Sequence, residues 1–185
     1  MIIAITGVGA VSALGQGAAA LFEGLCAGHT GLAGAPTWGE RGPAGMLDGG
    51  ADRRSSALAL LACREALGSD TLPPGLAVVG ATTSADMRAS EPAWAALAQG
   101  HEPADPDSFV WPQLCHLPTQ VVARAIGAQG PRMTISSACT SGACAVGVAA
   151  ELIMAGRAPA ALAFGADALC DTTVHGFASL GLYDP

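Results

Sequence analysis

The stretch GPRMTISSACTSG, at residues 130–142, decides the fold of this chain. A short β-type run from Met133 to Ile135 leads into a turn of small residues. The turn opens an apolar helix that we expect from about Ser141 to Ala155, ended by Gly156. A single cysteine, Cys139, lies in that turn between strand and helix.

The position of Cys139 predicts a reactive thiol. A cysteine at a strand-to-helix turn lies near unpaired backbone N–H groups and the positive end of the helix dipole, which favours the thiolate. The same geometry forms a nucleophile elbow, in which neighbouring N–H groups can hold a developing oxyanion. The alternative is a buried structural thiol, and the local sequence leaves both interpretations open.

The composition indicates one domain that is covered by other protein. Hydrophobic residues make up 51% of the 185 residues and charged residues only 12%, against about 25% in an average protein. No apolar run reaches the roughly 18 residues that a membrane helix needs, and residues 1–15 lack the basic start of a signal peptide. We therefore expect a single domain, 1–185, that lies in the cytoplasm and buries apolar surface against another protein.

The net charge of −7 and the absence of lysine argue against nucleic-acid binding, because no basic patch is available to neutralise phosphates. An acidic carrier domain could still dock on local arginines, with Arg53, Arg54 and Arg124 as candidates. The simpler interpretation of each arginine is a solvated charge on a helix face.

No metal or nucleotide site is expected. The six cysteines form no CxxC pair and no zinc-type spacing, so they are predicted to be free thiols in a reducing cytoplasm. All except Cys139 are expected to be packing residues, and the four histidines are expected to be structural. The stretch GVGAVS, at residues 7–12, lacks the third glycine and the acidic partner of a dinucleotide-binding loop.

Short apolar runs alternate with helical patterns along the chain. The predicted strands are Ile2–Thr6, Leu76–Val79 (closed by Gly80), Met133–Ile135 and Ala160–Phe164. Besides the helix after Cys139, the predicted helices are Ala18–Ala27, Arg54–Leu67, Pro92–Gln99, Pro118–Ile126 and Thr173–Leu180. Residues 29–52 and 100–116 are expected to be irregular. The alternation predicts an α/β fold with a mainly parallel sheet and helices on its faces.

The helix after Cys139 is apolar on every side, with Glu151 as its only charge. A helix of this kind is buried all round, so we place it in a central layer with protein on both sides. One four-stranded sheet covers one side, and the other side needs more chain than these 185 residues supply.

Four motifs give the chain a family resemblance. They are ITGVGAVSALG at 5–15, GP at 130–131 with SACTSG at 137–142, AFGADA at 163–168 and HGFASL at 175–180. With them the sequence resembles a β-ketoacyl synthase of the elongating type, within the thiolase fold. The long spacer between the second and third predicted strands also favours the elongating branch. The resemblance implies a thiolase-like, layered αβα fold, of which this chain holds the N-terminal half.

The resemblance also implies a chemistry, a decarboxylative Claisen condensation of acyl and malonyl thioesters in fatty acid or polyketide biosynthesis. Cys139 would accept an acyl group from a carrier-protein thioester, and the carbanion left by decarboxylation of malonyl carrier protein would attack it. The Cys139 N–H would be one oxyanion donor. Phe177 would gate the acyl tunnel, and Phe109 would reach the neighbouring subunit's pocket, although plain core packing stays open for both. No cofactor is implied beyond the phosphopantetheine of the acyl carrier protein.

The chain departs from the family in its length. Family members are roughly twice as long, and their second half supplies two histidines, a lysine and a second oxyanion donor. None of the four histidines here matches, and the antiparallel edge strand of the first half is absent. Expected partners are an acyl carrier protein and a homodimer or heterodimer with another ketosynthase-type chain, including a separate C-terminal half. Two alternatives stay open: a non-condensing interaction subunit or fragment, and an acyltransferase that uses Cys139 alone with an unidentified base.

Overall fold

A three-stranded parallel sheet in the order β6-β5-β7 forms the centre of the computed structural model, which describes residues 2–34, 43–45, 47, 55–69, 71–103 and 105–182. The strands are β5 (Ala77–Ala81), β6 (Arg132–Ile135) and β7 (Ala161–Gly165). Every residue of β5 is buried, because this strand pairs on both edges and is covered on both faces. The parallel sheet predicted from the sequence is confirmed.

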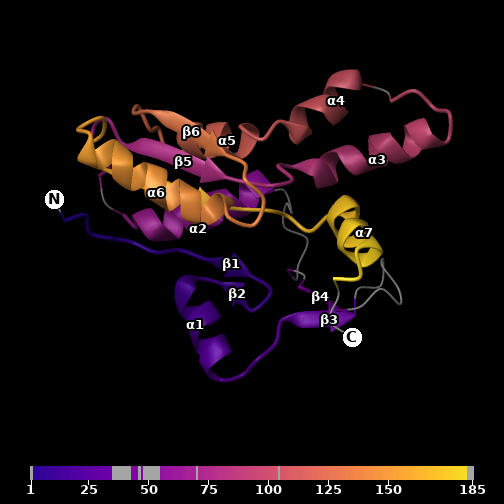
Figure 1. The fold of residues 1–185 in the computed structure, drawn as a ribbon, viewed down its shortest axis with the longest axis horizontal. Coiled ribbons are helices and arrows are strands. Elements are labelled where there is room, and N and C mark those ends of the chain that lie inside the picture. The colour runs from indigo at the N-terminus through magenta and orange to yellow at the C-terminus, as the bar shows by residue number, and fades with distance from the viewer. Residues whose placement is uncertain are drawn as a thin grey trace.

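Helices cover both faces of this sheet (Figure 1). Val78 and Leu162 pack against α2 (Ser55–Leu67) and α5 (Leu117–Ala125) on one face. Val79 and Ala81 pack against Ala145 and Ala149 of α6 (Ser141–Met154) on the other face. Because successive side chains of a strand point to opposite faces, the apolar runs of β5 and β7 serve both helix layers.

Gly80 was predicted to close the second strand, but β5 continues through it to Ala81. A Cβ atom on Gly80 would lie 2.3 Å from Thr119 Oγ1 and 2.7 Å from Phe164 Cζ. Glycine is present here because α5 and the neighbouring strand approach the backbone closely.

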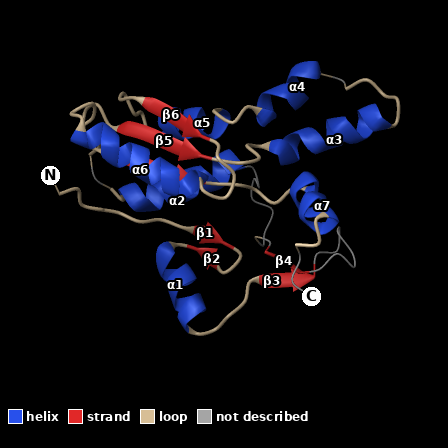
Figure 2. Ribbon diagram, in the orientation of Figure 1, coloured by secondary structure: helices blue, strands red, loops and turns tan. Residues whose placement is uncertain are grey.

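Two helices form an arm that projects from the body (Figure 2). They are α3 (Met87–Ala98), longer than predicted and with Pro92 inside it, and α4 (Pro106–Val110), which continues into the 3₁₀ helix η2 (Trp111–Gln113). Asp105 caps α4 by accepting a hydrogen bond of 3.0 Å from the Asp107 N–H. Part of the stretch predicted to be irregular is therefore helical.

The predicted strand Ile2–Thr6 is wrong. Among the residues that the structure describes, no strand pairs with this extended segment, and Ile2 and Ile5 are 97% and 82% exposed. A short hairpin of β1 (Val11–Ser12) and β2 (Gly15–Gln16) follows it instead. The apolar pattern of these residues is typical of a buried strand, but no described strand of the sheet lies beside them to form hydrogen bonds.

Contacts with α2 hold the beginning of the chain in place. A Cβ atom on Gly7 or Gly9 would lie 1.8 Å from Ala66 O or 2.0 Å from Ala62 O, respectively, so the backbone lies directly against the helix. The Glu65 carboxylate accepts hydrogen bonds from the N–H groups of Ala10 (2.9 Å) and Ala18 (2.7 Å). Ala18 is the first residue of α1 (Ala18–Cys26), whose predicted position is confirmed.

The stretch 29–52 contains a second small antiparallel pair, β3 (Leu32–Gly34) and β4 (Pro43–Gly45), where an irregular segment was expected. Most of the rest of this stretch lies outside the described residues, as do the candidate arginines Arg53 and Arg54. No helix in the described part of the chain is long and apolar enough to cross a bilayer.

The helix after the cysteine has the predicted bounds but is covered on one side only. Ala145 and Ala149 are buried against the sheet, whereas Val146 and Met154 are 55% and 52% exposed. The expectation of burial on every side is therefore wrong for this chain taken alone. The exposed side of α6, which faces away from the sheet, is the side that we expected additional protein to cover.

Candidate functional site

Cys139 lies on a strained turn between β6 and α6. The residue before it, Ala138, has φ 54°, in the left-handed region that residues with a Cβ atom rarely adopt. Ser141 Oγ stabilises the turn by donating to Ala138 O (2.7 Å) and accepting from Ser137 N–H (2.8 Å). Cys139 is exposed, which excludes the interpretation of a thiol buried in the core of this chain.

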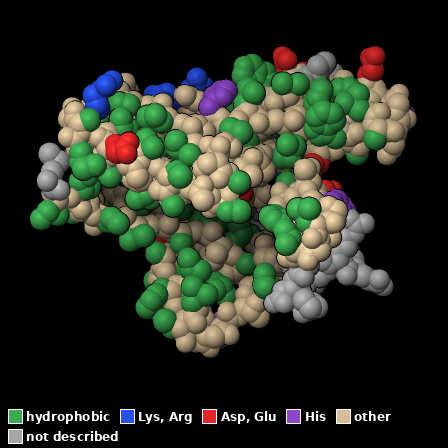
Figure 3. Space-filling model, viewed as in Figure 1, with side chains coloured by type: hydrophobic (Ala, Val, Ile, Leu, Met, Phe, Trp, Pro, Cys, Tyr) green, Lys and Arg blue, Asp and Glu red, His purple; other side chains and the backbone are tan. Residues whose placement is uncertain are grey.

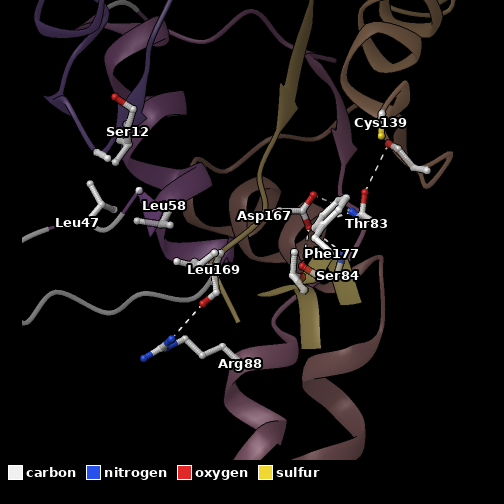
Figure 4. A pocket seen from close by; sticks show the side chains of 16 residues that line it. Ser12, Leu47, Leu58, Thr83, Ser84, Arg88, Cys139, Asp167, Leu169 and Phe177 are labelled. Carbon is white, nitrogen blue, oxygen red and sulfur yellow. Dashed lines mark hydrogen bonds between the residues drawn. The ribbon is translucent and has the colours of Figure 1, made fainter. Parts of the chain in front are cut away.

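Cys139 opens into a cavity of about 480 Å³ at the carboxyl ends of β5 and β7 (Figure 4). Phe177 of α7 (Asp171–Ser179) and residues of the β1–β2 hairpin line the same cavity. In parallel α/β sheets, ligands bind at this end of the strands. The structure therefore brings together two of the three predicted site residues, Cys139 and Phe177.

Asp167, which the sequence analysis did not single out, organises the base of this cavity. Its Oδ1 atom accepts from Thr82 Oγ1 (2.7 Å), Thr83 N–H (2.9 Å), Ser84 N–H (2.7 Å) and Ser84 Oγ (2.8 Å). These donors follow β5, and Asp167 follows β7, 83 to 85 residues later. Polar residues directly after two neighbouring parallel strands were the signal that could have identified the cluster.

The Asp167 cluster is connected to the turn that carries the cysteine. Thr83 Oγ1 lies 3.5 Å from Ala138 O, at the limit of a hydrogen bond (Figure 4). Thr82 Oγ1 also accepts from the N–H of Ala85 (2.9 Å), a second residue in the left-handed region. The carboxylate thus fixes the loop that faces the left-handed turn.

Buried hydrogen bonds join the end of this loop to the first residues of α2. Ser55 Oγ donates to Ala85 O and accepts from Ala168 N–H at 2.8 Å. The Asp86 carboxylate is 1% exposed and accepts from Ser56 N–H (2.9 Å) and Ser56 Oγ (2.6 Å). Buried polar groups that are fully hydrogen-bonded in this way favour one fixed arrangement.

Among the described residues that line the cavity, Arg88 carries the positive charge. Its Nη1 atom donates a hydrogen bond of 3.0 Å to Leu169 O. No histidine or lysine lines the described part of the cavity. His175 instead lines a separate hollow beside α3, with Glu91 and Asp171. In the described part of the chain, no cluster of histidine, cysteine and acidic side chains could hold a metal ion.

Phe109 lies outside this cavity. It belongs to α4 and packs edge-on against Trp94, with ring centroids 5.2 Å apart. Its predicted reach into a neighbouring subunit stays a prediction. Of the other five cysteines, Cys63 and Cys170 are buried as expected, and Cys115 is partly buried. Cys26 and Cys144 are exposed, so the expectation that they are packing residues is wrong within this chain.

Comparisons with known proteins agree with this architecture. The family model described as Beta-ketoacyl synthase, N-terminal domain, matches residues 51–185. The structure titled "The ishigamide ketosynthase/chain length factor" aligns with 98% of this chain and 51% of its own chain, at 24% identity and a TM-score of 0.81. A β-ketoacyl synthase from Burkholderia phymatum aligns over 95% of this chain and 49% of its own, at 26% identity and a TM-score of 0.76.

A third similar structure is that of a type II PKS acyl-carrier protein in complex with its ketosynthase bound to a hexaketide. It aligns with 96% of this chain and 54% of its own, at 19% identity and a TM-score of 0.70. No curated protein matches the sequence. The chain therefore spans about half the length of the solved structures that it resembles.

Proposed function

Because this chain belongs to the β-ketoacyl synthase family, whose N-terminal domain it carries, we propose that it is the nucleophile-bearing half of a β-ketoacyl-ACP synthase. The reaction would be the condensation of acyl and malonyl thioesters in fatty acid or polyketide-type biosynthesis. The observation that carries the proposal is Cys139 itself, exposed on a left-handed turn and open to the cavity that Phe177 also lines.

In the first half-reaction, the Cys139 sulfur attacks the carbonyl carbon of an acyl thioester. A new C–S bond forms, and the phosphopantetheine thiol of the carrier protein leaves with a proton. The Cys139 N–H, at the entry of α6, is the donor proposed for the developing oxyanion. Leu58, Leu169 and Phe177 give the cavity apolar walls that suit an acyl chain.

The second half-reaction needs groups from outside the described cavity. Loss of carbon dioxide from a malonyl thioester develops negative charge on the remaining carbon and its carbonyl oxygen, which donors must stabilise. No histidine or lysine lines the described cavity. We propose that the complementary half of the ketosynthase fold, which lies outside these 185 residues, supplies these groups.

The proposed substrate carrier is an acyl carrier protein, which brings the acyl and malonyl groups on phosphopantetheine. The similar structure that pairs an acyl-carrier protein with its ketosynthase supports this partner. Phe109 is proposed to act across a dimer, because within this chain it packs on Trp94 outside the cavity.

The second candidate function is a non-condensing interaction subunit that keeps the fold and its surfaces. The lack of histidine and lysine in the described cavity lining favours it. Cys139 argues against it, since a subunit without condensing chemistry has no need of an exposed thiol at this turn.

The test compares Cys139→Ser with Cys144→Ser. Both thiols are exposed in the wild-type chain, and Cys144 lies in the first turns of α6. We expect a cerulenin-like epoxide or an acyl thioester to add one acyl or inhibitor mass to the wild type and to Cys144→Ser, and none to Cys139→Ser. Labelling that persists in Cys139→Ser would show that another thiol is the reactive one.

A further inference from the structure

Arg88 places a positive charge at one end of the cavity into which Cys139 opens. Figure 4 shows these two side chains at opposite ends of the cavity, with Phe177 and Asp167 between them in that view. On the face that Figure 3 draws, arginine side chains appear along the upper edge of the body, and none appears beside α7, where this cavity lies. Because Arg88 is half-buried and lines the cavity, its charge acts on whatever the cavity holds.

A hydrogen bond across the fold fixes the guanidinium of Arg88. Arg88 is the second residue of α3, and its Nη1 atom donates to the carbonyl oxygen of Leu169, in the segment after β7, at 3.0 Å. With the described residues, the guanidinium forms no other hydrogen bond and no ion pair. A guanidinium presents more N–H donors than this one bond uses, so donors remain for a ligand in the cavity.

The acidic side chains near Arg88 are engaged elsewhere. Asp167, the other charged residue of the described lining, accepts hydrogen bonds from the loop after β5. Asp86 accepts from the start of α2, and Glu91, one turn further along α3, accepts from the Thr172 N–H at 2.8 Å. The first turn of α3 has no acidic residue, and its helix dipole opposes a cation there. No described residue therefore supplies the anion that Arg88 lacks.

The walls of the cavity suit an acyl chain, whereas its cationic end does not suit a hydrocarbon. Leu58, Leu169 and Phe177 provide apolar walls. A methyl end that reached Arg88 would displace water from the guanidinium without replacing the lost hydrogen bonds, which is unfavourable. A carboxylate at the same place would accept a pair of N–H groups side by side, the arrangement that guanidinium and carboxylate favour.

The phosphate of the phosphopantetheine arm is the other anion that a carrier-bound substrate brings. This phosphate is bonded directly to the carrier protein and stays at the surface, whereas Arg88 is half-buried within the cavity lining. Arg88 also lies at the far end of the cavity from Cys139, where the remote end of an acyl chain would lie (Figure 4). Both observations favour the acyl group over the phosphate.

We infer that Arg88 selects acyl groups that carry a carboxylate at the end remote from the thioester. Such a group is a dicarboxylic acid, longer than malonic acid, that is joined to its carrier through one of its carboxyl groups. The inference rests on the proposed function, because it concerns the acyl group that Cys139 accepts. Arg88 is then a specificity-determining residue that contacts the substrate away from the reacting carbonyl.

The test follows acylation of Cys139 by peptide mass spectrometry, on the protein purified from its producing cells. Pantetheine thioesters of ω-carboxyacyl groups of increasing length each compete with the plain acyl thioester that has the same number of carbon atoms. At one length we expect the carboxylated thioester to acylate Cys139 at least about tenfold faster than its plain counterpart. Carboxylated thioesters that react no faster at any length would overturn the inference.

Variants at Arg88 separate selection from support of the fold. Arg88→Gln removes the charge but keeps an N–H donor for Leu169 O, and Arg88→Lys keeps the charge. We expect the ratio of the two acylation rates to fall to about one in Arg88→Gln and to survive in part in Arg88→Lys. Arg64→Gln, at an exposed position of α2 outside the cavity, is the matched control and should keep the wild-type ratio. A wild-type ratio in Arg88→Gln, with both rates lowered equally, would mean that Arg88 only supports the fold.

Phosphopantetheine thioesters distinguish the acyl carboxylate from the phosphate. If Arg88→Gln slowed these thioesters whatever their acyl group, and left the pantetheine thioesters unaffected, Arg88 would bind the phosphate and the inference would be wrong.

A second measurement needs no acylation. Amide analogues of the same thioesters should protect Cys139 from iodoacetamide, and we expect the carboxylated analogue to protect at a concentration lower by about tenfold in the wild type but not in Arg88→Gln. Such protection without any acylation would refute the proposed function alone. Acylation without a preference that depends on Arg88 would refute the selection alone, and so would equal protection by the two analogues.

Discussion

At the scale of single residues, the backbone of Ala138 positions the proposed nucleophile. A left-handed conformation at a residue with a Cβ atom persists only when its surroundings enforce it, and such residues concentrate at functional sites. Here Ser141 and Thr140 hydrogen-bond within the turn, and Thr83 approaches Ala138 O from the loop that Asp167 holds. The Asp167 carboxylate, which follows β7, therefore contributes to fixing the turn that carries Cys139.

Removing that carboxylate tests the connection. Asp167→Ala leaves the N–H groups of Thr83 and Ser84 without their acceptor, and hydrogen bonds to a charged group contribute about 1.5–3 kcal/mol each when removed singly. We expect the rate of Cys139 acylation to fall about tenfold, with the alkylation rate of Cys144 unchanged. Kinetics followed by peptide mass spectrometry measure both thiols in one sample. An equal loss of rate at both would indicate general unfolding instead.

Cys63 is buried in the core, and burial raises the pKa of its thiol from 9.0 to about 12. The unfolded chain loses this proton near pH 9 and the folded chain does not, so the stability that Cys63 contributes is complete below about pH 9 and declines as the pH rises towards about 12. At about pH 9 we expect iodoacetamide to alkylate exposed Cys26 and to leave Cys63 unmodified until urea is added. Equal labelling of the two thiols in the folded protein would contradict this.

At the scale of elements, two glycines that both lie within apolar runs of the sequence have different surroundings in the structure. Gly80 lies in β5 against Thr119 and Phe164, whereas a Cβ atom on Gly147 of α6 would meet nothing within 4 Å. Gly80→Ala is expected to lower the free energy of unfolding by about 1–3 kcal/mol through overpacking. Gly147→Ala is expected to raise it by up to about 1 kcal/mol, since alanine favours the helix. Urea unfolding measures both, and a destabilised Gly147→Ala would show that α6 is packed more closely there.

The elements that could be predicted from the sequence are those that local patterns determine. The turn at Cys139, α6 and the strand Met133–Ile135 follow from a small-residue turn between two apolar runs, and the structure confirms them. The strand Ile2–Thr6 could not be judged locally, because a strand exists only beside a partner, and this chain supplies none among its described residues. Asp167 was missed for a related reason, since its hydrogen-bond donors lie 83 to 85 residues away in the chain.

At the scale of the whole molecule, the exposed apolar residues indicate what is missing. Val146 on α6 and Ile5 near the start of the chain are exposed, and they line the same cavity, between the N-terminal segment and β7. Contiguous apolar surface of this kind marks a place that further protein covers. The low charged fraction of 12% agrees with a chain that is largely covered in its working state.

The isolated chain is expected to be unable to decarboxylate malonyl carrier protein, because no histidine or lysine lines the described cavity around Cys139. Release of labelled carbon dioxide from malonyl carrier protein measures this step, with the buffer alone as the background. Release above background by the pure 185-residue chain would contradict the proposal that a second half supplies the decarboxylating groups.

Native mass spectrometry of the protein purified from its producing cells tests the central claim most directly. If these residues are the nucleophile-bearing half of a ketosynthase, their 18.2 kDa should be accompanied by a complementary half, either in the same polypeptide or in a second one of similar or larger mass. Recovery of the chain alone, or only as multiples of itself, would contradict the account and favour the non-condensing subunit.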